Sequence, residues 1–195
     1  MLTENELIKF RRELHSYPET GWCEFVTTHK IVEKLRSFGL DPIYGRQVIN
    51  PEFVAGRNPA KVEEAKKAAL DKGVPPEFIE SMQDYTGVAA IFETGRPGPV
   101  LAIRFDMDCV DVDEAHEAGH RPFDEGWAST NPGHMHSCGH DGHTTMGIAV
   151  CNWIQENLDQ FCGTIKVVFQ PAEEGVRGAR PMTETGIFDD VDFFF

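Results

Sequence analysis

Two short runs of apolar and β-branched residues constrain the fold of this chain most strongly: "PVLAIRF" at residues 99–105 and "GTIKVVF" at residues 163–169. Each run has the length of a buried strand and is bounded by turn residues. Between them, apolar residues repeat with helical spacing from about Gly142 to Leu158. The order strand, helix, strand is typical of an open α/β sheet, and we expect that fold class here.

The N-terminal third adds further elements to this sheet. Thr3 and Glu6 form a capping-box pattern, which predicts a first helix from about residue 4 to the turn at Pro18. A second apolar pattern ends at Gly39, which is placed to take a left-handed helix cap, and "LDPIYG" then predicts a short strand. Residues 46–85 are rich in Lys, Glu and Ala, and we expect them to form an exposed helical excursion.

Composition excludes several classes of function. The chain has 195 residues, a length that favours one domain, and 32 acidic against 18 basic side chains give a net charge of -14. No Lys/Arg-rich run offers a surface for phosphates, so we expect no nucleic-acid partner. The N-terminus lacks the continuous apolar stretch of a secretory signal, and no segment reaches membrane-spanning length. These features predict a soluble, cytoplasmic protein with no membrane contact.

The cysteines do not suggest a disulfide framework. There are five, an odd number, scattered along a chain without an export signal. Cys151 and Cys162 each lie in or beside an apolar pattern, and we expect both to be small buried apolar groups. Cys138 differs because of its neighbours.

Polar clusters follow the predicted strands. Asp106 and Asp108 come directly after the first central run, and Glu173 and Glu174 come after the second. The stretch "HMHSCGHDGHTTMG" at residues 134–147 stands at the entry to the helix between them. In an open α/β sheet, the residues just past the carboxyl ends of the strands form the ligand crevice. We therefore expect all three clusters to meet there.

The residue types in these clusters suit a metal ion. Cys138 and His140 are two positions apart, so in an extended segment both side chains would leave the same face. Thiolate and imidazole suit Zn²⁺ or a similar transition ion. Of two adjacent acids such as Glu173 and Glu174, one can bind metal while the other carries a proton. The pattern predicts a metal-dependent hydrolytic site.

A competing hypothesis makes Cys138 an attacking thiolate with His140 or His143 as its base. It gives the carboxylates no task, and several acids around a thiol would raise its pKa, whereas a bound dication would lower it. No Cys-x-x-Cys redox motif is present. The metal hypothesis is therefore preferred, and the roles of Asp106, His136 and His143 stay open.

Three motifs resemble a known family. "RFDMD", "MHSCGHDGHT" and "FQPAEEG" resemble, in order and separation, the aminoacylase and carboxypeptidase G family of metal-dependent amidohydrolases. The resemblance is to the branch that includes indoleacetyl-amino-acid and N-acyl-amino-acid hydrolases, and "RRELHSYPETGWCEF" is similar to the N-terminal signature of that branch. "GRQVIN", "TGRPGPV", "HRPFDEGWAS" and "RGAR" look closest to its aminobenzoyl-glutamate hydrolases. Essentially the whole chain is covered.

The resemblance implies roles for individual residues. Cys138, His140 and Glu174 match metal ligands of a site for two divalent ions. Glu173 matches the general base, and Asp108 matches the aspartate that orients the site. Asp106 stands where other branches carry a ligand histidine. The thiolate ligand favours Zn²⁺, whereas the aminobenzoyl-glutamate branch points to Mn²⁺.

The resemblance also implies a fold that is incomplete here. The expected fold is an α/β metallopeptidase catalytic domain, an open mixed sheet flanked by helices. Family members are considerably longer, with further histidine ligands and an inserted dimerisation domain that this chain lacks. We therefore expect residues 1–195 to be the N-terminal part of the catalytic domain, with an incomplete metal site and little or no turnover alone.

The implied reaction is hydrolysis of the amide bond of an N-acyl amino acid. The favoured substrate is p-aminobenzoyl-glutamate, cleaved to p-aminobenzoate and glutamate. Two alternatives remain: a general N-acyl-amino-acid deacylase, and a non-catalytic metal-binding partner subunit. The resemblance implies that the partner is a related second subunit, or that a homodimer forms through the missing domain.

Overall fold

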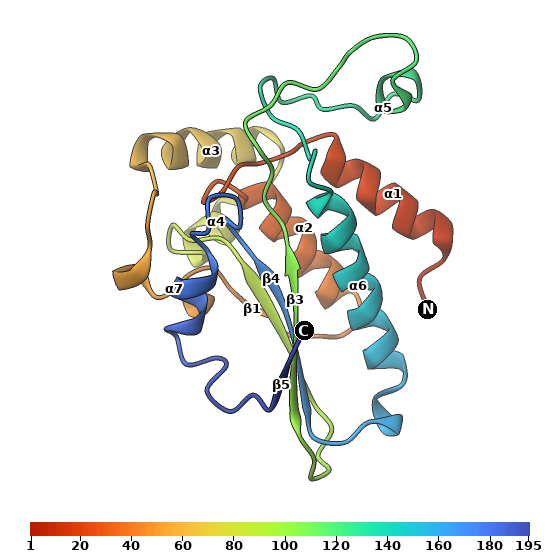
Figure 1. Cartoon of the computed structure of the whole chain (residues 1–195), viewed down its shortest axis with the longest axis vertical. Helices are drawn as coiled ribbons and strands as arrows, with labels where there is room; N and C mark the ends of the chain where they lie inside the picture. Colours follow the sequence, from red (N-terminus) through yellow and green to blue (C-terminus); the bar gives the residue numbers. More distant parts are fainter.

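The computed structural model describes residues 1–195 and contains a five-stranded sheet with helices around it (Figure 1). The helices are α1 (Glu4–His15), α2 (Phe25–Arg36), α3 (Pro59–Asp71), α4 (Pro76–Ser81), α5 (Arg121–Asp124), α6 (His140–Glu156) and α7 (Ala179–Thr183). The 3₁₀ turns are η1 (Gly45–Val48), η2 (Pro51–Phe53) and η3 (Leu158–Gln160). None of the helices combines the length and apolar character needed to span a lipid bilayer.

The strands form one open mixed sheet, as expected. They are β1 (Ile43–Tyr44), β2 (Val88–Glu93), β3 (Val100–Asp106), β4 (Thr164–Gln170) and β5 (Phe193–Phe194), in the spatial order β1-β2-β4-β3-β5. β3 runs parallel to both β4 and β5, whereas β2 is antiparallel to β4 and β1. Because β3 and β4 are parallel, their carboxyl ends lie at the same edge, where Asp106 pairs with Gln170.

Both faces of the sheet are covered. Along β2, Val88 and Ala90 belong to the larger hydrophobic cluster, whereas Ala89 between them packs in a second cluster with Val168 of β4 and Met182 of α7. This alternation follows from the period of two along a strand. α2 and α6 cover the first face, α1 packs on the outside of α6, and α7 lies on the opposite side (Figure 1).

α6 approaches the sheet closely through Gly147. A Cβ atom there would lie 2.5 Å from Phe169 Cε1 and 2.7 Å from Phe105 Cδ2. We expect Gly147→Ala to lower the free energy of unfolding by about 1–3 kcal/mol, because two aromatic rings would have to move. Urea denaturation measures this change. Gly142→Ala is the matched control, since nothing lies within 4 Å of that Cβ; it should gain up to about 1 kcal/mol. Equal effects at both positions would contradict the packing argument.

The first two helices form as the sequence predicts. The α1 capping box between Thr3 and Glu6 is present, and Gly39 takes a left-handed φ of 81° after α2. The prediction for Cys162 is wrong: this cysteine is exposed. It lies in the loop between η3 and β4, where the apolar pattern of the strand has not yet begun.

Residues 46–85 are largely helical, but only their outer face is exposed. Val62 and Ala69 of α3 are buried, and so are Phe78 and Ile79 of α4. All four belong to the larger hydrophobic cluster, and α3 contacts α2. Because Val62 and Ala69 are seven positions apart, they share one narrow stripe of α3, which the abundance of Lys, Glu and Ala conceals in the sequence.

Candidate metal centre

The three polar clusters meet at the carboxyl edge of β3 and β4. β3 ends at Asp106, with Asp108 two residues further, and β4 ends at Gln170 just before Glu173 and Glu174. α6 begins at His140 at the same edge and returns along the sheet. The parallel pairing of β3 and β4 thus brings residues about 65 positions apart into contact, as in the hydrogen bond from the Glu173 amide to Asp108.

His140 is the centre of this cluster. Its Nδ1 lies 2.8 Å from the main-chain oxygen of Asp108. Since a carbonyl oxygen only accepts, Nδ1 is the donor, which leaves Nε2 to face the cluster. Three carboxylate oxygens surround Nε2: Asp106 Oδ2 at 3.8 Å, Glu173 Oε2 at 3.8 Å and Glu174 Oε1 at 3.9 Å.

The electrostatics of the cluster favour a cation. Burial lowers the pKa of His140, but the hydrogen bonds and negative charge of Asp108, followed by the charge of Asp106, outweigh it and raise the pKa to about 9. The carboxylates therefore hold a proton on this imidazole. A metal ion bound at Nε2 would take the place of that proton and neutralise the same charges.

The two adjacent glutamates differ in their surroundings. Glu174 Oε1 is buried without a hydrogen-bond partner, and a buried carboxylate oxygen left in this way needs a cation or another donor. The Glu173 side chain is 36% exposed, against 27% for Glu174. Donor atoms of His140, Glu173 and Glu174 all lie within 4.8 Å of one another, so this group fits a divalent ion.

Cys138 lies beside this group but outside it. The sequence argument assumed an extended segment, which is wrong: Cys138 is in a turn, and Gly139 takes a left-handed φ of 82° before α6 begins. Cys138 is exposed. A hydrogen bond with Glu174, followed by slight burial and nearby negative charges, raises the pKa of its thiol. A raised pKa disfavours the uncatalysed thiolate that the nucleophile hypothesis requires.

Two residues whose roles the sequence left open contact each other. His143 Nδ1 lies 3.3 Å from Asp106 Oδ2, and with His140 these two form a second group whose donor atoms lie within 4.8 Å. Arg104 also donates to Asp106. His136 is buried, with no partner for either ring nitrogen, and burial lowers its pKa to about 4, so it is neutral.

The sequence argument missed a buried network behind the cluster. His15 of α1 bridges two buried acids, with Nδ1 2.9 Å from Asp141 Oδ2 and Nε2 3.0 Å from Glu114 Oε1. Arg11 also pairs with Asp141, the residue after His140. This network ties α1 and the segment around Glu114 to the start of α6. A histidine beside Leu14 on the apolar face of α1 is the signal that could have indicated it.

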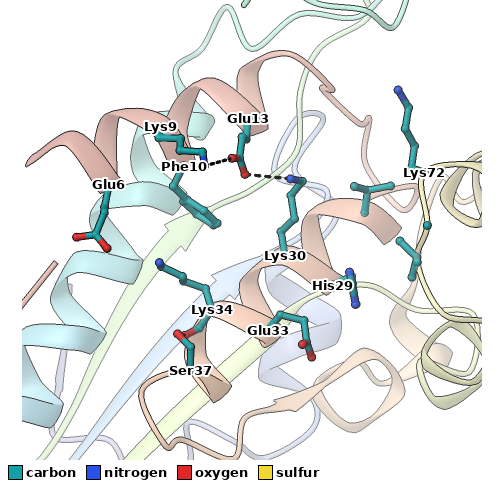
Figure 2. A pocket seen from close by; sticks show the side chains of 13 residues that line it. Glu6, Lys9, Phe10, Glu13, His29, Lys30, Glu33, Lys34, Ser37 and Lys72 are labelled. Carbon is teal, nitrogen blue, oxygen red and sulfur yellow. Dashed lines mark hydrogen bonds and ion pairs between the residues drawn. The ribbon is translucent and has the colours of Figure 1, made fainter. Parts of the chain in front are cut away.

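A cavity of about 580 Å³ between α1 and α2 contains none of the cluster residues. Its wall carries both signs of charge, and Figure 2 shows Glu13 between Lys9 and Lys30. Because its charges are paired within the wall, this cavity is a solvated groove between helices, and the chemistry belongs to the edge of the sheet.

Comparison with known proteins gives a consistent result. Residues 102–195 match the model of peptidase family M20/M25/M40. A homologue of one subunit of p-aminobenzoyl-glutamate hydrolase, from Haemophilus influenzae, is 48% identical over 97% of this chain and 45% of its own length. Indole-3-acetyl-aspartic acid hydrolase from Enterobacter agglomerans is 44% identical over 97% of this chain and 44% of its own length.

A solved structure shares the fold and the sequence. It is a dinuclear metal-binding peptidase of the M20 family from Bacillus subtilis, with a TM-score of 0.71 and 29% identity over 98% of this chain and 42% of that one. The chain thus spans less than half the length of the relatives it matches.

Proposed function

Because the chain carries a domain of peptidase family M20, we propose that the protein containing these residues is a metal-dependent amidohydrolase. One observation carries this proposal: His140 Nε2 faces three carboxylate oxygens at 3.8–3.9 Å, one of which, Glu174 Oε1, is buried without a partner. Such a concentration of negative charge around an imidazole fits a divalent cation and explains no other feature of the fold.

Metal binding would use the donors nearest this imidazole. We propose His140 and Glu174 as ligands, with the Cys138 thiol, which hydrogen-bonds Glu174, as a third. A divalent ion there, Zn²⁺ or Mn²⁺, would acidify a water molecule and polarise an amide carbonyl. A second ion is supported by the dinuclear relative.

The residues of this chain then have separate tasks. Glu173, the more exposed of the two glutamates, would take a proton from water and deliver it to the leaving nitrogen. Asp108 is fully buried, accepts the amide hydrogens of both glutamates and contacts His140, so it would orient all three.

The substrate class follows from the relatives. The names of two relatives specify an aromatic acyl group joined to an acidic amino acid, glutamate in one and aspartate in the other. We propose an N-acyl amino acid of this kind, with p-aminobenzoyl-glutamate first. A general N-acyl-amino-acid deacylase is the alternative. Because the first of these relatives is named as one of the subunits of its enzyme, a partner in the form of a related second subunit is supported too.

We expect the protein containing these residues to release p-aminobenzoate from p-aminobenzoyl-glutamate, and a chelator to lower the rate by about 10²-fold or more because water activation needs the ion. Liquid chromatography measures the product, with N-acetyl-alanine as the test for a general deacylase. Adding back Zn²⁺ or Mn²⁺ separately identifies the metal that restores the rate. A rate that the chelator leaves unchanged would contradict the proposal.

A further inference from the structure

The turn that carries the two glutamates is held by two buried carboxylates. Three successive main-chain amides donate to them: Ala172 to Glu24 Oε1 at 2.8 Å, Glu173 to Asp108 Oδ1 at 3.1 Å and Glu174 to Asp108 Oδ2 at 3.1 Å. Glu24 and Asp108 are both fully buried. The positions of the Glu173 and Glu174 side chains therefore depend on two acids from distant parts of the chain.

Glu24 is diverted from the task that its position would give it. It is the residue before α2, where a side chain normally caps the first amides of the helix, but it makes no such bond. Glu19 caps α2 instead, accepting from the amides of Val26 and Thr27. Glu24 reaches Ala172 with one oxygen and accepts from Thr86 Oγ1 at 2.6 Å with the other.

The turn needs this support because its backbone is strained. Ala172, which is buried, has a φ of 49°, a conformation that non-glycine residues rarely adopt. Burial, together with the charge of Asp108, raises the pKa of Glu24 to about 8. An acid kept in such an unfavourable environment must be held there by its contacts, and those contacts are the turn and Thr86.

We propose that Glu24 is a positioning residue for the metal centre, which fixes the direction of Glu173 and Glu174 through the Ala172 amide. It rests on the proposed function, since a positioning role requires a site to position. Glu24 touches neither substrate nor metal in this scheme, and acts only through the backbone of residues 172–174.

The test separates reach from charge. Glu24→Asp keeps the charge but shortens the side chain, so its bond to the Ala172 amide is lost. Glu24→Gln keeps the reach and one acceptor oxygen but loses the charge. We expect Glu24→Asp to lower metal affinity and kcat by about 10-fold each with little change in KM, and Glu24→Gln to stay within about 3-fold of the parent. Metal titration and steady-state kinetics give these values.

Glu19→Asp is the matched control, because Glu19 is an equally enclosed acid that caps α2 and makes no contact with the turn. It should lower Tm and leave metal affinity within about 2-fold of the parent, as loss of a helix cap affects stability alone. A third measurement, amide hydrogen exchange, should show faster exchange at residues 172–174 in Glu24→Asp and unchanged exchange there in Glu19→Asp.

The outcomes separate the two proposals. Equal losses of metal affinity in Glu24→Asp and Glu19→Asp, or unchanged exchange at residues 172–174 in Glu24→Asp, would overturn the positioning role even if the parent hydrolyses its substrate. A parent that binds metal, shows the exchange contrast and hydrolyses no N-acyl amino acid would overturn the proposed function and retain the positioning role. A parent that binds no metal would overturn both.

Discussion

Replacing Glu173 with glutamine should lower kcat for hydrolysis of the N-acyl amino acid by about 10²-fold or more while the bound metal is retained. Glutamine has nearly the same shape, but its amide cannot take a proton from water at neutral pH. The Glu173 main-chain amide, which bonds to Asp108, is unaffected, so the turn should keep its conformation. Elemental analysis and steady-state kinetics on the same preparation measure both quantities.

Glu77→Gln is the control for this substitution, because it removes one acidic charge in α4, remote in the fold from the carboxyl edge of the sheet. Its kcat should match that of the parent. If Glu173→Gln also keeps the parental kcat, Glu173 is not the base. If neither the parent nor the variants turn over substrate but all bind metal, the protein belongs to the non-catalytic, metal-binding alternative.

Much of the fold could be predicted from the sequence because its signals are local. The strand β4, for example, is an unbroken apolar run bounded by Gly163 and Pro171, and α1 begins at a capping box. Contacts between distant elements gave weaker signals. The buried stripe of α3 consists of two residues among many Lys, Glu and Ala, so its packing against α2 was not visible.

The meeting of the three polar clusters could be predicted for a similar reason: strand ends are local features, and parallel strands place them together. The supporting residues could not. Glu24 contacts Ala172 across 148 positions, and His15 contacts Asp141 across 126. Neither pair has a pattern of spacing, because each side chain is recruited by the packing of α1 or α2 against the rest of the fold.

The turn at Cys138 was also hidden, and it determines how the thiol approaches the cluster. Gly139, in its left-handed conformation, turns the chain from Cys138 into the first residue of α6. Cys138 therefore reaches the cluster from its solvent side, beside Glu174, while His140 approaches from the buried side. A thiol in this position can close a metal site that the imidazole and carboxylates begin.

We therefore expect Cys138→Ser to lower metal affinity by about 10-fold or more, since a serine hydroxyl is a much poorer ligand than a thiolate for Zn²⁺ or a similar ion. Elemental analysis for Zn, Mn, Co, Ni and Fe on the purified protein measures the loss. Cys162→Ser is the matched control, because Cys162 is also exposed but lies in the loop before β4. It should retain the parental metal content.

The comparison separates three arrangements of the centre. Metal lost in Cys138→Ser and kept in Cys162→Ser would make the thiol a ligand, even though it lies outside the compact group of His140, Glu173 and Glu174. Metal kept in both would leave the imidazole and carboxylates as sufficient ligands and make Cys138 a neighbour only. Metal absent from the parent as well would contradict the proposed centre, because the buried, unpartnered oxygen of Glu174 would then have another explanation.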